Sequence, residues 1–119
     1  MSVVLVADDE VDILDLLRIV LSRAGHEVVA AHDGEEALRL VADREPALAV
    51  LDVSMPKLDG LEVTRRLRSA DETRELPVIL LSARAQPSDV ELGLAVGANA
   101  YLCKPVGADE LREQVASLL

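Results

Sequence analysis

The chain has 119 residues and a formal net charge of −10, with 22 acidic side chains against 12 basic ones. This length is typical of one domain, so we predict a single domain over residues 1–119. The acidic balance argues against direct binding of nucleic acid, because surfaces that bind phosphate backbones are basic. Tyr101 is the only aromatic residue, which leaves no stacking platform for flavins or nucleobases.

Cysteine usage and apolar patterning bear on the compartment. The single cysteine, Cys103, can form no internal disulfide, which favours a reducing cytoplasm. We predict that it is a small buried residue of a strand rather than a redox group. The beginning of the sequence has no signal-peptide pattern, and the apolar runs are far shorter than the roughly 20 residues that span a bilayer. The sequence therefore predicts a cytoplasmic protein that does not enter a membrane.

Short apolar runs rich in Val and Leu alternate with segments of helical length. Runs of this kind are typical of strands that are buried on both faces. In chain order, we expect strands at residues 3–7, 28–31, 47–51, 78–81 and 100–103. Apolar residues recur at helical spacing after each strand, as Leu14, Leu17 and Leu21 do after the first. The alternation predicts an α/β fold, a doubly wound five-stranded parallel sheet with five helices on its two faces.

Single residues mark where some of these helices begin. Asp59 is placed to cap the helix after the third strand, and Gly60 to allow the turn into it. Pro87 fits the first turn of the fourth helix. These positions support the alternating pattern independently of the apolar spacing.

Polar residues follow most of the predicted strands directly. Asp8 and Asp9 come after the first strand, Asp52 after the third, Ser82 after the fourth and Lys104 after the fifth. The carboxyl ends of parallel strands form the ligand crevice of an open sheet. We therefore expect three carboxylates, one hydroxyl and one ammonium group to converge at this edge.

Such a cluster has a definite chemistry. Two carboxylates 4 Å apart repel each other by roughly 4 kcal/mol at an effective dielectric of 20, so a proton or a cation must compensate the charge. Oxygen ligands without His or thiolate point to Mg²⁺. An aspartate, Mg²⁺, a lysine and a hydroxyl are the parts of phosphoryl transfer, in which an aspartate oxygen attacks phosphorus.

Two motifs make the chain similar to a known family. The run D-V-S-M-P-K-L-D-G at 52–60 and the run Y-L-C-K-P at 101–105, together with Asp8, Asp9 and Ser82, resemble the receiver domain of two-component response regulators. The resemblance covers the whole chain. It implies a flavodoxin-like fold with strand order 2-1-3-4-5. It also implies a regulatory domain that is no enzyme beyond catalysing its own phosphorylation and dephosphorylation.

The resemblance implies a phosphoacceptor and a metal site. Asp52 would take a phosphoryl group from the phosphohistidine of a histidine kinase or a phosphotransfer protein. Asp9, Asp52 and the backbone carbonyl of Ser54 would hold Mg²⁺, and Asp8 would act mainly through the waters of the metal.

The resemblance also implies roles around the phosphoryl group. Lys104 would pair with its oxygens, and Ser82 would swing inward to bond one of them, beside the small Ala83. The bond from Lys104 to Pro105 would be cis and aim the lysine inward.

Three further positions relate to switching and rate. Tyr101 would be the switch aromatic, whose ring moves inward with Ser82; the alternative is an ordinary tyrosine at a sheet edge. Ser54 and Arg84 stand where members of the family tune autodephosphorylation.

The fourth helix carries apolar residues on two faces. Val90 and Leu94 share one face, Leu92 and Val96 share the other, and only one face can meet the sheet. We predict that the free face joins the fourth helix, fifth strand and fifth helix in a partner surface that is remodelled on phosphorylation. Its partner would be a target protein or a second copy of the chain.

Two other functions stay open at this point. A haloacid-dehalogenase-like phosphohydrolase also phosphorylates an aspartate, but the run at 8–12 lacks the Thr of its motif and no residues are left for a cap. A pseudo-receiver, which binds protein without being phosphorylated, is disfavoured because the acids, the hydroxyl and the lysine are all present.

Overall fold

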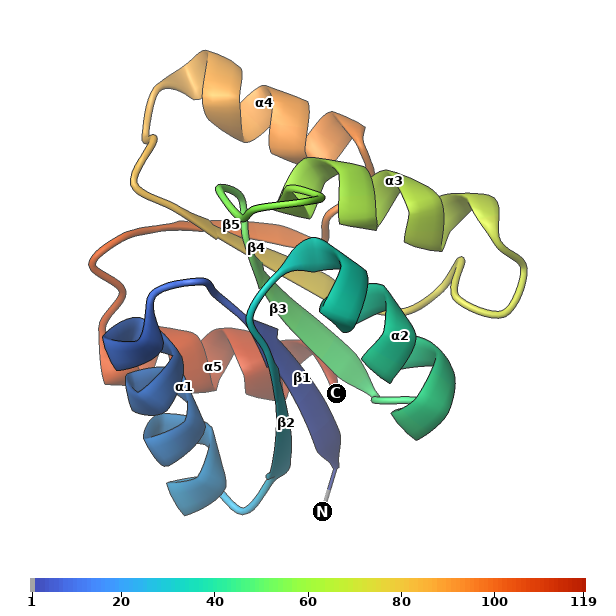
Figure 1. The fold of residues 1–119 in the computed structure, drawn as a ribbon. Coiled ribbons are helices and arrows are strands. Elements are labelled where there is room, and N and C mark those ends of the chain that lie inside the picture. The colour runs from blue at the N-terminus through green and yellow to red at the C-terminus, as the bar shows by residue number, and fades with distance from the viewer. Residues whose placement is uncertain (1) are drawn as a thin grey trace.

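Strands and helices alternate along residues 2–119, the part of the chain that this computed structural model describes (Figure 1). The strands are β1 (Val3–Ala7), β2 (Glu27–Ala31), β3 (Leu48–Asp52), β4 (Val78–Ser82) and β5 (Ala100–Cys103). The helices are α1 (Val11–Arg23), α2 (Gly34–Arg44), α3 (Gly60–Ser69), α4 (Pro87–Ala95) and α5 (Ala108–Leu118). Every predicted strand is confirmed to within one residue at each end. Within residues 2–119, no helix is long and apolar enough to cross a bilayer.

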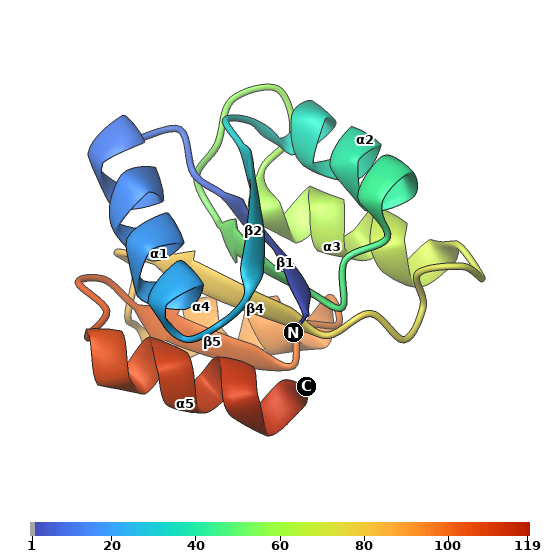
Figure 2. The ribbon, with the colours of Figure 1, turned by 90° about the horizontal axis from the view of Figure 1, so that it is seen from below.

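The five strands form one parallel sheet in the order β2-β1-β3-β4-β5. Helices α1 and α5 cover one face of this sheet, and α2, α3 and α4 cover the other (Figures 1 and 2). The predicted doubly wound architecture and strand order are therefore confirmed. In this topology the chain moves from β1 outward to β2 and then returns to β3 on the other side of β1. The strand order thus reverses at β1 and β3, and the carboxyl ends of strands at such a point form the ligand crevice of open α/β sheets.

The core has two layers, one on each face of the sheet. Along β1, Val4 and Val6 pack with the layer under α1 and α5, whereas Leu5 and Ala7 pack with the layer under α2 and α3. All four side chains are fully buried. Because both faces of the central strands are covered, these strands need apolar residues at every position, which explains the uninterrupted apolar runs in the sequence.

Two glycines let helices α2 and α3 close onto the loop that follows β3. A Cβ atom at Gly60 would lie 2.4 Å from the backbone oxygen of Asp52, and one at Gly34 would lie 2.1 Å from the backbone oxygen of Leu58. Gly60 is thus required for this close approach. The φ angle of Gly60 is not positive, so the turn that we assigned to it does not need a glycine. Both helices begin against the same loop, which ties their positions to the end of β3.

The predicted helix starts of α3 and α4 are confirmed. The Asp59 carboxylate accepts a hydrogen bond of 2.8 Å from the Glu62 amide, as expected of an N-cap. Pro87 occupies the first turn of α4, where its missing N–H has no helical partner in any case.

Helix α4 meets the sheet through a different line of residues from the predicted one. Gly93 is buried and Val90 and Val96 are half-buried, whereas Leu92 and Leu94 are 50% and 46% exposed. The inward line has a spacing of three residues centred on Gly93, so the two leucines fall on opposite flanks of the helix. The predicted pairing of Val90 with Leu94 and of Leu92 with Val96 is therefore wrong.

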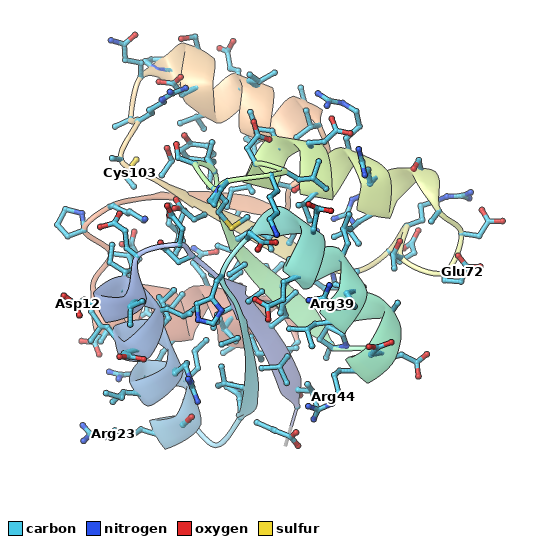
Figure 3. All side chains as sticks on the ribbon, viewed as in Figure 1. Asp12, Arg23, Arg39, Arg44, Glu72 and Cys103 are labelled. Carbon is cyan, nitrogen blue, oxygen red and sulfur yellow. The ribbon has the colours of Figure 1, made fainter. Side chains whose placement is uncertain are left out.

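The prediction that Cys103 is buried is also wrong, because its side chain is exposed (Figure 3). Cys103 ends β5, which lies at the edge of the sheet. Successive side chains of a strand point to opposite faces. Its neighbour Leu102 is buried in the layer under α5, so Cys103 points to the opposite face of the sheet, on which Tyr101 packs against α4.

Candidate functional site

The polar residues that follow the strands do meet at the carboxyl edge of the sheet. Asp8 directly follows β1, Asp52 ends β3, Ser82 ends β4 and Lys104 directly follows β5. β1, β3 and β4 are neighbours in the sheet, and the crevice between β1 and β3 lies among them. The predicted convergence of the three aspartates and Lys104 at this edge is confirmed.

Three carboxylates form the centre of this site. Asp8, Asp9 and Asp52 each place an oxygen atom within 4.8 Å of the others. Asp8 and Asp52 are buried, with 0% and 3% exposure, whereas Asp9 is open to solvent at the mouth of the crevice. A set of carboxylate oxygens without imidazole or thiolate suits a hard divalent cation, and the exposed Asp9 leaves a way in.

Lys104 already compensates part of this charge. Its Nζ atom lies 2.9 Å from Asp8 Oδ2, 3.1 Å from Asp52 Oδ1 and 3.9 Å from Glu10 Oε1. Burial alone would lower the pKa of Lys104, but its bonds to Asp8 and Asp52 outweigh burial and raise this pKa. The Lys104–Pro105 peptide bond is cis, as expected from the resemblance. The lysine thus bridges the two buried acids.

Asp8 is held on both of its oxygens, which the sequence did not reveal. Besides its ion pair with Lys104, it accepts a 2.9 Å hydrogen bond from the Glu10 amide on Oδ1. The spacing of residues in the sequence cannot tell which of two adjacent aspartates turns inward. The Asp8–Lys104 pair was for this reason not predicted.

The surroundings of Asp52 oppose the ionisation of its carboxyl group. Burial raises its pKa to about 6, the charge of Asp8 adds to the rise, and Lys104 opposes it. The Asp52 carboxylate is therefore ionised at neutral pH, but its ionisation in the folded state lowers the free energy of unfolding. A cation or a neutral group at this position would relieve that cost.

The loops around the acids carry the remaining predicted residues. Ser82 is 2% exposed, and its Oγ accepts a 3.0 Å hydrogen bond from the Arg84 amide. Ser54, Ala83 and Arg84 are exposed beside the crevice. Ser82 thus ends β4 at this edge but is bonded to its own loop, while the other three residues are open to solvent.

Tyr101 lies on β5 under helix α4. Its hydroxyl donates a 2.9 Å hydrogen bond to the backbone oxygen of Arg84. A Cβ atom at Gly93 would lie only 2.6 Å from the ring carbon Cδ2 and 3.2 Å from Leu80. Gly93 therefore provides the slot for this ring. The sequence did contain a signal for this role, since a glycine inside a helix costs about 1 kcal/mol relative to alanine and calls for a packing reason.

Comparison with known proteins places this geometry in a family. Residues 4–116 match the family described as the response regulator receiver domain. The chain belongs to this family. A putative response regulator from Chloroflexus aurantiacus has the same fold in its crystal structure. The two structures align over 98% of this chain and 96% of that one, with a TM-score of 0.94 and 35% sequence identity.

Two curated relatives are similar over nearly the whole receiver domain. The alkaline phosphatase synthesis transcriptional regulatory protein PhoP of Bacillus subtilis is 42% identical over 98% of this chain and 48% of its own length. The response regulator MprA of Mycobacterium ulcerans is 47% identical over 98% of this chain and 49% of its own. The chain thus spans about half of the length of these relatives. A phosphoacceptor function in two-component signalling fits the family, and neither the phosphohydrolase nor the pseudo-receiver finds support.

The slot for Tyr101 leads to a prediction about Gly93. Intrinsic helix propensity alone would make Gly93→Ala stabilising by about 1 kcal/mol. Because the new methyl group would overlap the ring, we expect instead that the ring leaves the slot and that its bond to Arg84 breaks. Tyr101 is the only aromatic residue, so its fluorescence reports this position alone.

A matched control is available for this substitution. A Cβ atom at Gly107 would have no neighbour within 4 Å. Gly107→Ala should leave the tyrosine emission and its quenching by iodide unchanged, whereas Gly93→Ala should change both. Equal spectra for the two variants would mean that α4 shifts to make room and that Gly93 does not position the ring.

Proposed function

We propose that the chain is a phosphoacceptor in which Asp52 receives a phosphoryl group with the help of Mg²⁺. The observation that carries the proposal is the position of Lys104 Nζ, 3.1 Å from Asp52 Oδ1 in a crevice with two further carboxylates. Asp52 is recessed but borders the exposed Asp9, so a small or projecting donor can reach it. The domain itself is regulatory, and the only chemistry we assign to it is its own phosphorylation and dephosphorylation.

The residues of the crevice divide the work of this transfer. An Oδ atom of Asp52 attacks phosphorus as the bond from phosphorus to the donor's imidazole nitrogen breaks, and the imidazole keeps that electron pair. Lys104 neutralises the phosphoryl oxygens beside Asp52. Asp9, Asp52 and the Ser54 carbonyl would hold Mg²⁺, and Asp8 would act mainly through the waters of the metal. When it is bound, the ion supplies further positive charge to those oxygens.

The loop after β4 offers a way to pass the change on. Ser82 Oγ and the Tyr101 hydroxyl both bond to Arg84, the first to its amide and the second to its carbonyl. We propose that Ser82 leaves the Arg84 amide for a phosphoryl oxygen, next to Ala83. Arg84 then moves, and its backbone oxygen, which accepts the hydrogen bond from the Tyr101 hydroxyl, moves with it. The position of the Tyr101 ring therefore changes with the state of the switch. Arg84 and Ser54, exposed beside the crevice, are placed to influence how fast water removes the phosphoryl group.

The phosphoryl donor needs a docking surface near Asp52. Helix α1 begins two residues after Asp9 and exposes Val11, Leu16 and Ile19 by 57%, 54% and 49%. Receiver domains interact with histidine kinases, and we propose that a kinase or a phosphotransfer protein covers these side chains while its histidine reaches the crevice. We place this exchange in the cytoplasm, where the exposed thiol of Cys103 stays reduced.

The output surface we propose lies on α4, β5 and α5. The exposed Leu92 and Leu94 flank Gly93, which lies against the Tyr101 ring. A movement of this ring would therefore change the position of α4 and of both leucine side chains. The double change Leu92→Ser and Leu94→Ser should leave the unfolding free energy within about 1 kcal/mol, since neither side chain is buried.

Sedimentation velocity of the phosphorylated protein tests this surface. A dimer of the parent that the double serine variant cannot form would identify the partner as a second copy of the chain. A parent that stays monomeric would assign the surface to a different target. A dimer of unchanged affinity in both proteins would rule out α4 as its interface.

Phosphorylation itself can be tested with a small donor. Acetyl phosphate with Mg²⁺ should add one phosphoryl mass to the protein, and Asp52→Asn or chelation of Mg²⁺ should abolish this addition. Asp12→Asn is a suitable control, because Asp12 is an exposed acid of α1 outside the cluster (Figure 3). A parent protein that stays unmodified, or an Asp52→Asn variant that is still modified, would overturn the proposal.

A further inference from the structure

A groove lies between helices α2 and α3 at the end of the molecule remote from the acids. Its volume is about 440 Å³, within the range of roughly 300 to 1,000 Å³ that is typical of sites for small molecules. Pro46 and Leu76, which line it, stand just before β3 and β4. The groove thus opens at the amino ends of the strands, whereas the acid cluster lies at their carboxyl ends.

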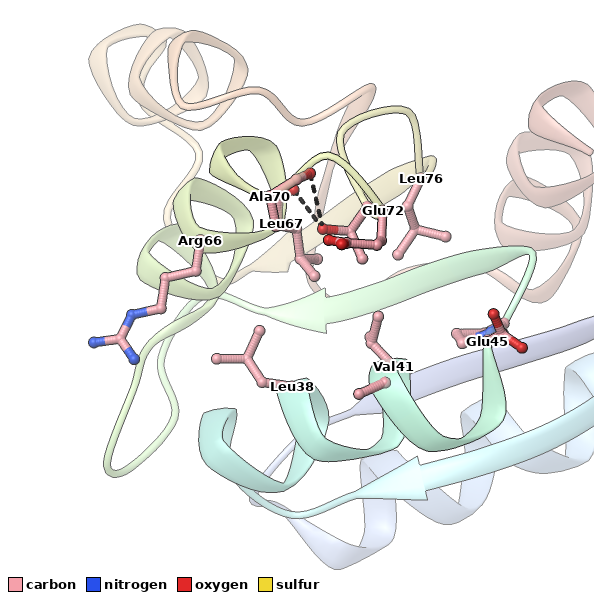
Figure 4. A pocket seen from close by; sticks show the side chains of 11 residues that line it. Leu38, Val41, Glu45, Arg66, Leu67, Ala70, Glu72 and Leu76 are labelled. Atoms are coloured by element: carbon pink, nitrogen blue, oxygen red, sulfur yellow. Dashed lines mark hydrogen bonds between the residues drawn. The ribbon is translucent and has the colours of Figure 1, made fainter.

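The floor of the groove is apolar and its shape depends on small residues. Leu38 and Val41 on α2 face Leu67 on α3 (Figure 4). The lining also includes two alanines, Ala42 on α2 and Ala70 at the end of α3. Apart from Leu38 near the middle of α2, the helical residues of the lining come from the carboxyl halves of α2 and α3, so the groove lies between those ends of the helices.

The lining of the groove carries a net negative charge, because Glu45 and Glu72 outnumber its one basic residue. Glu45 on the α2 side and Glu72 on the α3 side are exposed, and neither has an ion-pair partner within residues 2–119. The one basic residue of the lining, Arg66, donates a 3.0 Å bond from Nε to Glu62, a carboxylate that it shares with Arg65. The Thr73 hydroxyl is likewise occupied, since it donates to the Leu67 backbone oxygen at 2.6 Å.

From the apolar floor and the two free carboxylates we infer that this groove binds a small amphiphile with an apolar body and a protonated amine. The body would lie against Leu38, Val41 and Leu67, and the amine between Glu45 and Glu72. An anionic amphiphile would meet the same floor but an unfavourable rim. The site is separate from the phosphoryl crevice, so its occupancy does not depend on Mg²⁺ or on Asp52.

Phenylbutylamine is a suitable probe, with phenylbutanol and phenylbutyrate as its neutral and anionic counterparts. We expect the amine to shift amide NMR signals of α2 and of the loop after α3 with a dissociation constant on the order of 1 mM. The neutral compound should bind about threefold more weakly and the anion more weakly still. Signals of Asp9, Asp52 and Lys104 should stay in place.

Two kinds of variant separate the floor from the rim. Ala70→Phe should fill the groove and abolish the shifts for the amine and the alcohol alike; Ala42→Leu serves the same purpose if Ala70→Phe does not fold. Glu45→Gln together with Glu72→Gln should weaken the amine to the affinity of the alcohol and leave the alcohol unchanged. Shifts outside the groove, equal binding of the anion, or binding that survives both filling variants would overturn the inference.

Discussion

Asp52→Asn should make the metal-free protein more stable at neutral pH, by about 2 to 3 kcal/mol. The pKa of Asp52 is raised to about 6 from an ordinary value of 3.8, chiefly by burial and then by the charge of Asp8. The folded state therefore keeps a proton that the unfolded state releases as the pH rises above about 4. Stability falls over this window until the folded carboxylate has also ionised, near pH 6.

The neutral amide of Asn has the shape of the acid without this titration. The difference in unfolding free energy between the variant and the parent should be close to zero at pH 4, grow up to pH 6 and then level off. Urea unfolding at a series of pH values, with a chelator present, measures it. A difference that is constant across the series, or a variant that is less stable at pH 7, would contradict the assigned cost of ionising Asp52.

This prediction separates two properties of the same side chain. The ionised acid is needed for attack on phosphorus and for holding a cation, yet it destabilises the fold in the absence of both. Mg²⁺ should therefore raise the stability of the parent more than that of Asp52→Asn. The cost is an expected feature of a binding site, where stability is sacrificed for charge that a ligand later neutralises.

Much of the fold could be predicted because each element has a local cause. The central strands are covered on both faces, so their residues form apolar runs that stand out in the sequence. The position of Asp52 followed from the same reasoning, since a polar residue at the end of a buried strand must lie at the edge of the sheet. The strand order came from the resemblance to receiver domains, because apolar spacing does not encode which strands are neighbours.

The errors concern places where the sheet ends. Cys103 lies on the edge strand β5, and α4 is the helix that packs against this strand. One face of β5 is only partly covered. Apolar residues at the edge of a sheet do not have to be buried. Leu92 and Leu94 therefore suggested that α4 has two packed faces, although both side chains are exposed. The position of α4 that faces the sheet is occupied by Gly93. Glycine has no apolar side chain, so hydrophobic spacing cannot identify it as a buried position.

The ion pairs within the site depend on side-chain paths through space. Lys104 and Asp8 are 96 positions apart, and their contact at 2.9 Å requires both the parallel register of the sheet and the direction in which each side chain leaves its strand. The sequence indicates that they share an edge. It does not indicate that Asp8 binds the lysine while the adjacent Asp9 faces solvent.

Removal of the Lys104 charge should be the most damaging single change at this edge. Lys104→Met keeps the length of the chain but leaves Asp8 and Asp52 without the ammonium that now lies 2.9 and 3.1 Å away. Loss of one partner of a buried ion pair typically costs 3–5 kcal/mol, and we expect a loss of about 3 kcal/mol in unfolding free energy at pH 7. The other lysine, Lys57, is a matched control: it lies 3.6 Å from Asp33 with 59% exposure, and Lys57→Met should cost less than about 1 kcal/mol.

The repulsion that Lys104→Met leaves behind can be relieved in three ways, and each gives a separate measurement. Lowering the pH to 5 should recover part of the loss, because Asp52 is already half-protonated near pH 6 in the parent and holds its proton more tightly without the lysine. Asp52→Asn in the same chain should recover stability beyond the sum of the two single effects. Mg²⁺ should bind Lys104→Met about tenfold more tightly than the parent, since it no longer competes with the ammonium, although phosphorylation by acetyl phosphate slows. A variant as stable as Lys57→Met, with unchanged affinity for Mg²⁺, would mean that Lys104 does not compensate the buried acids.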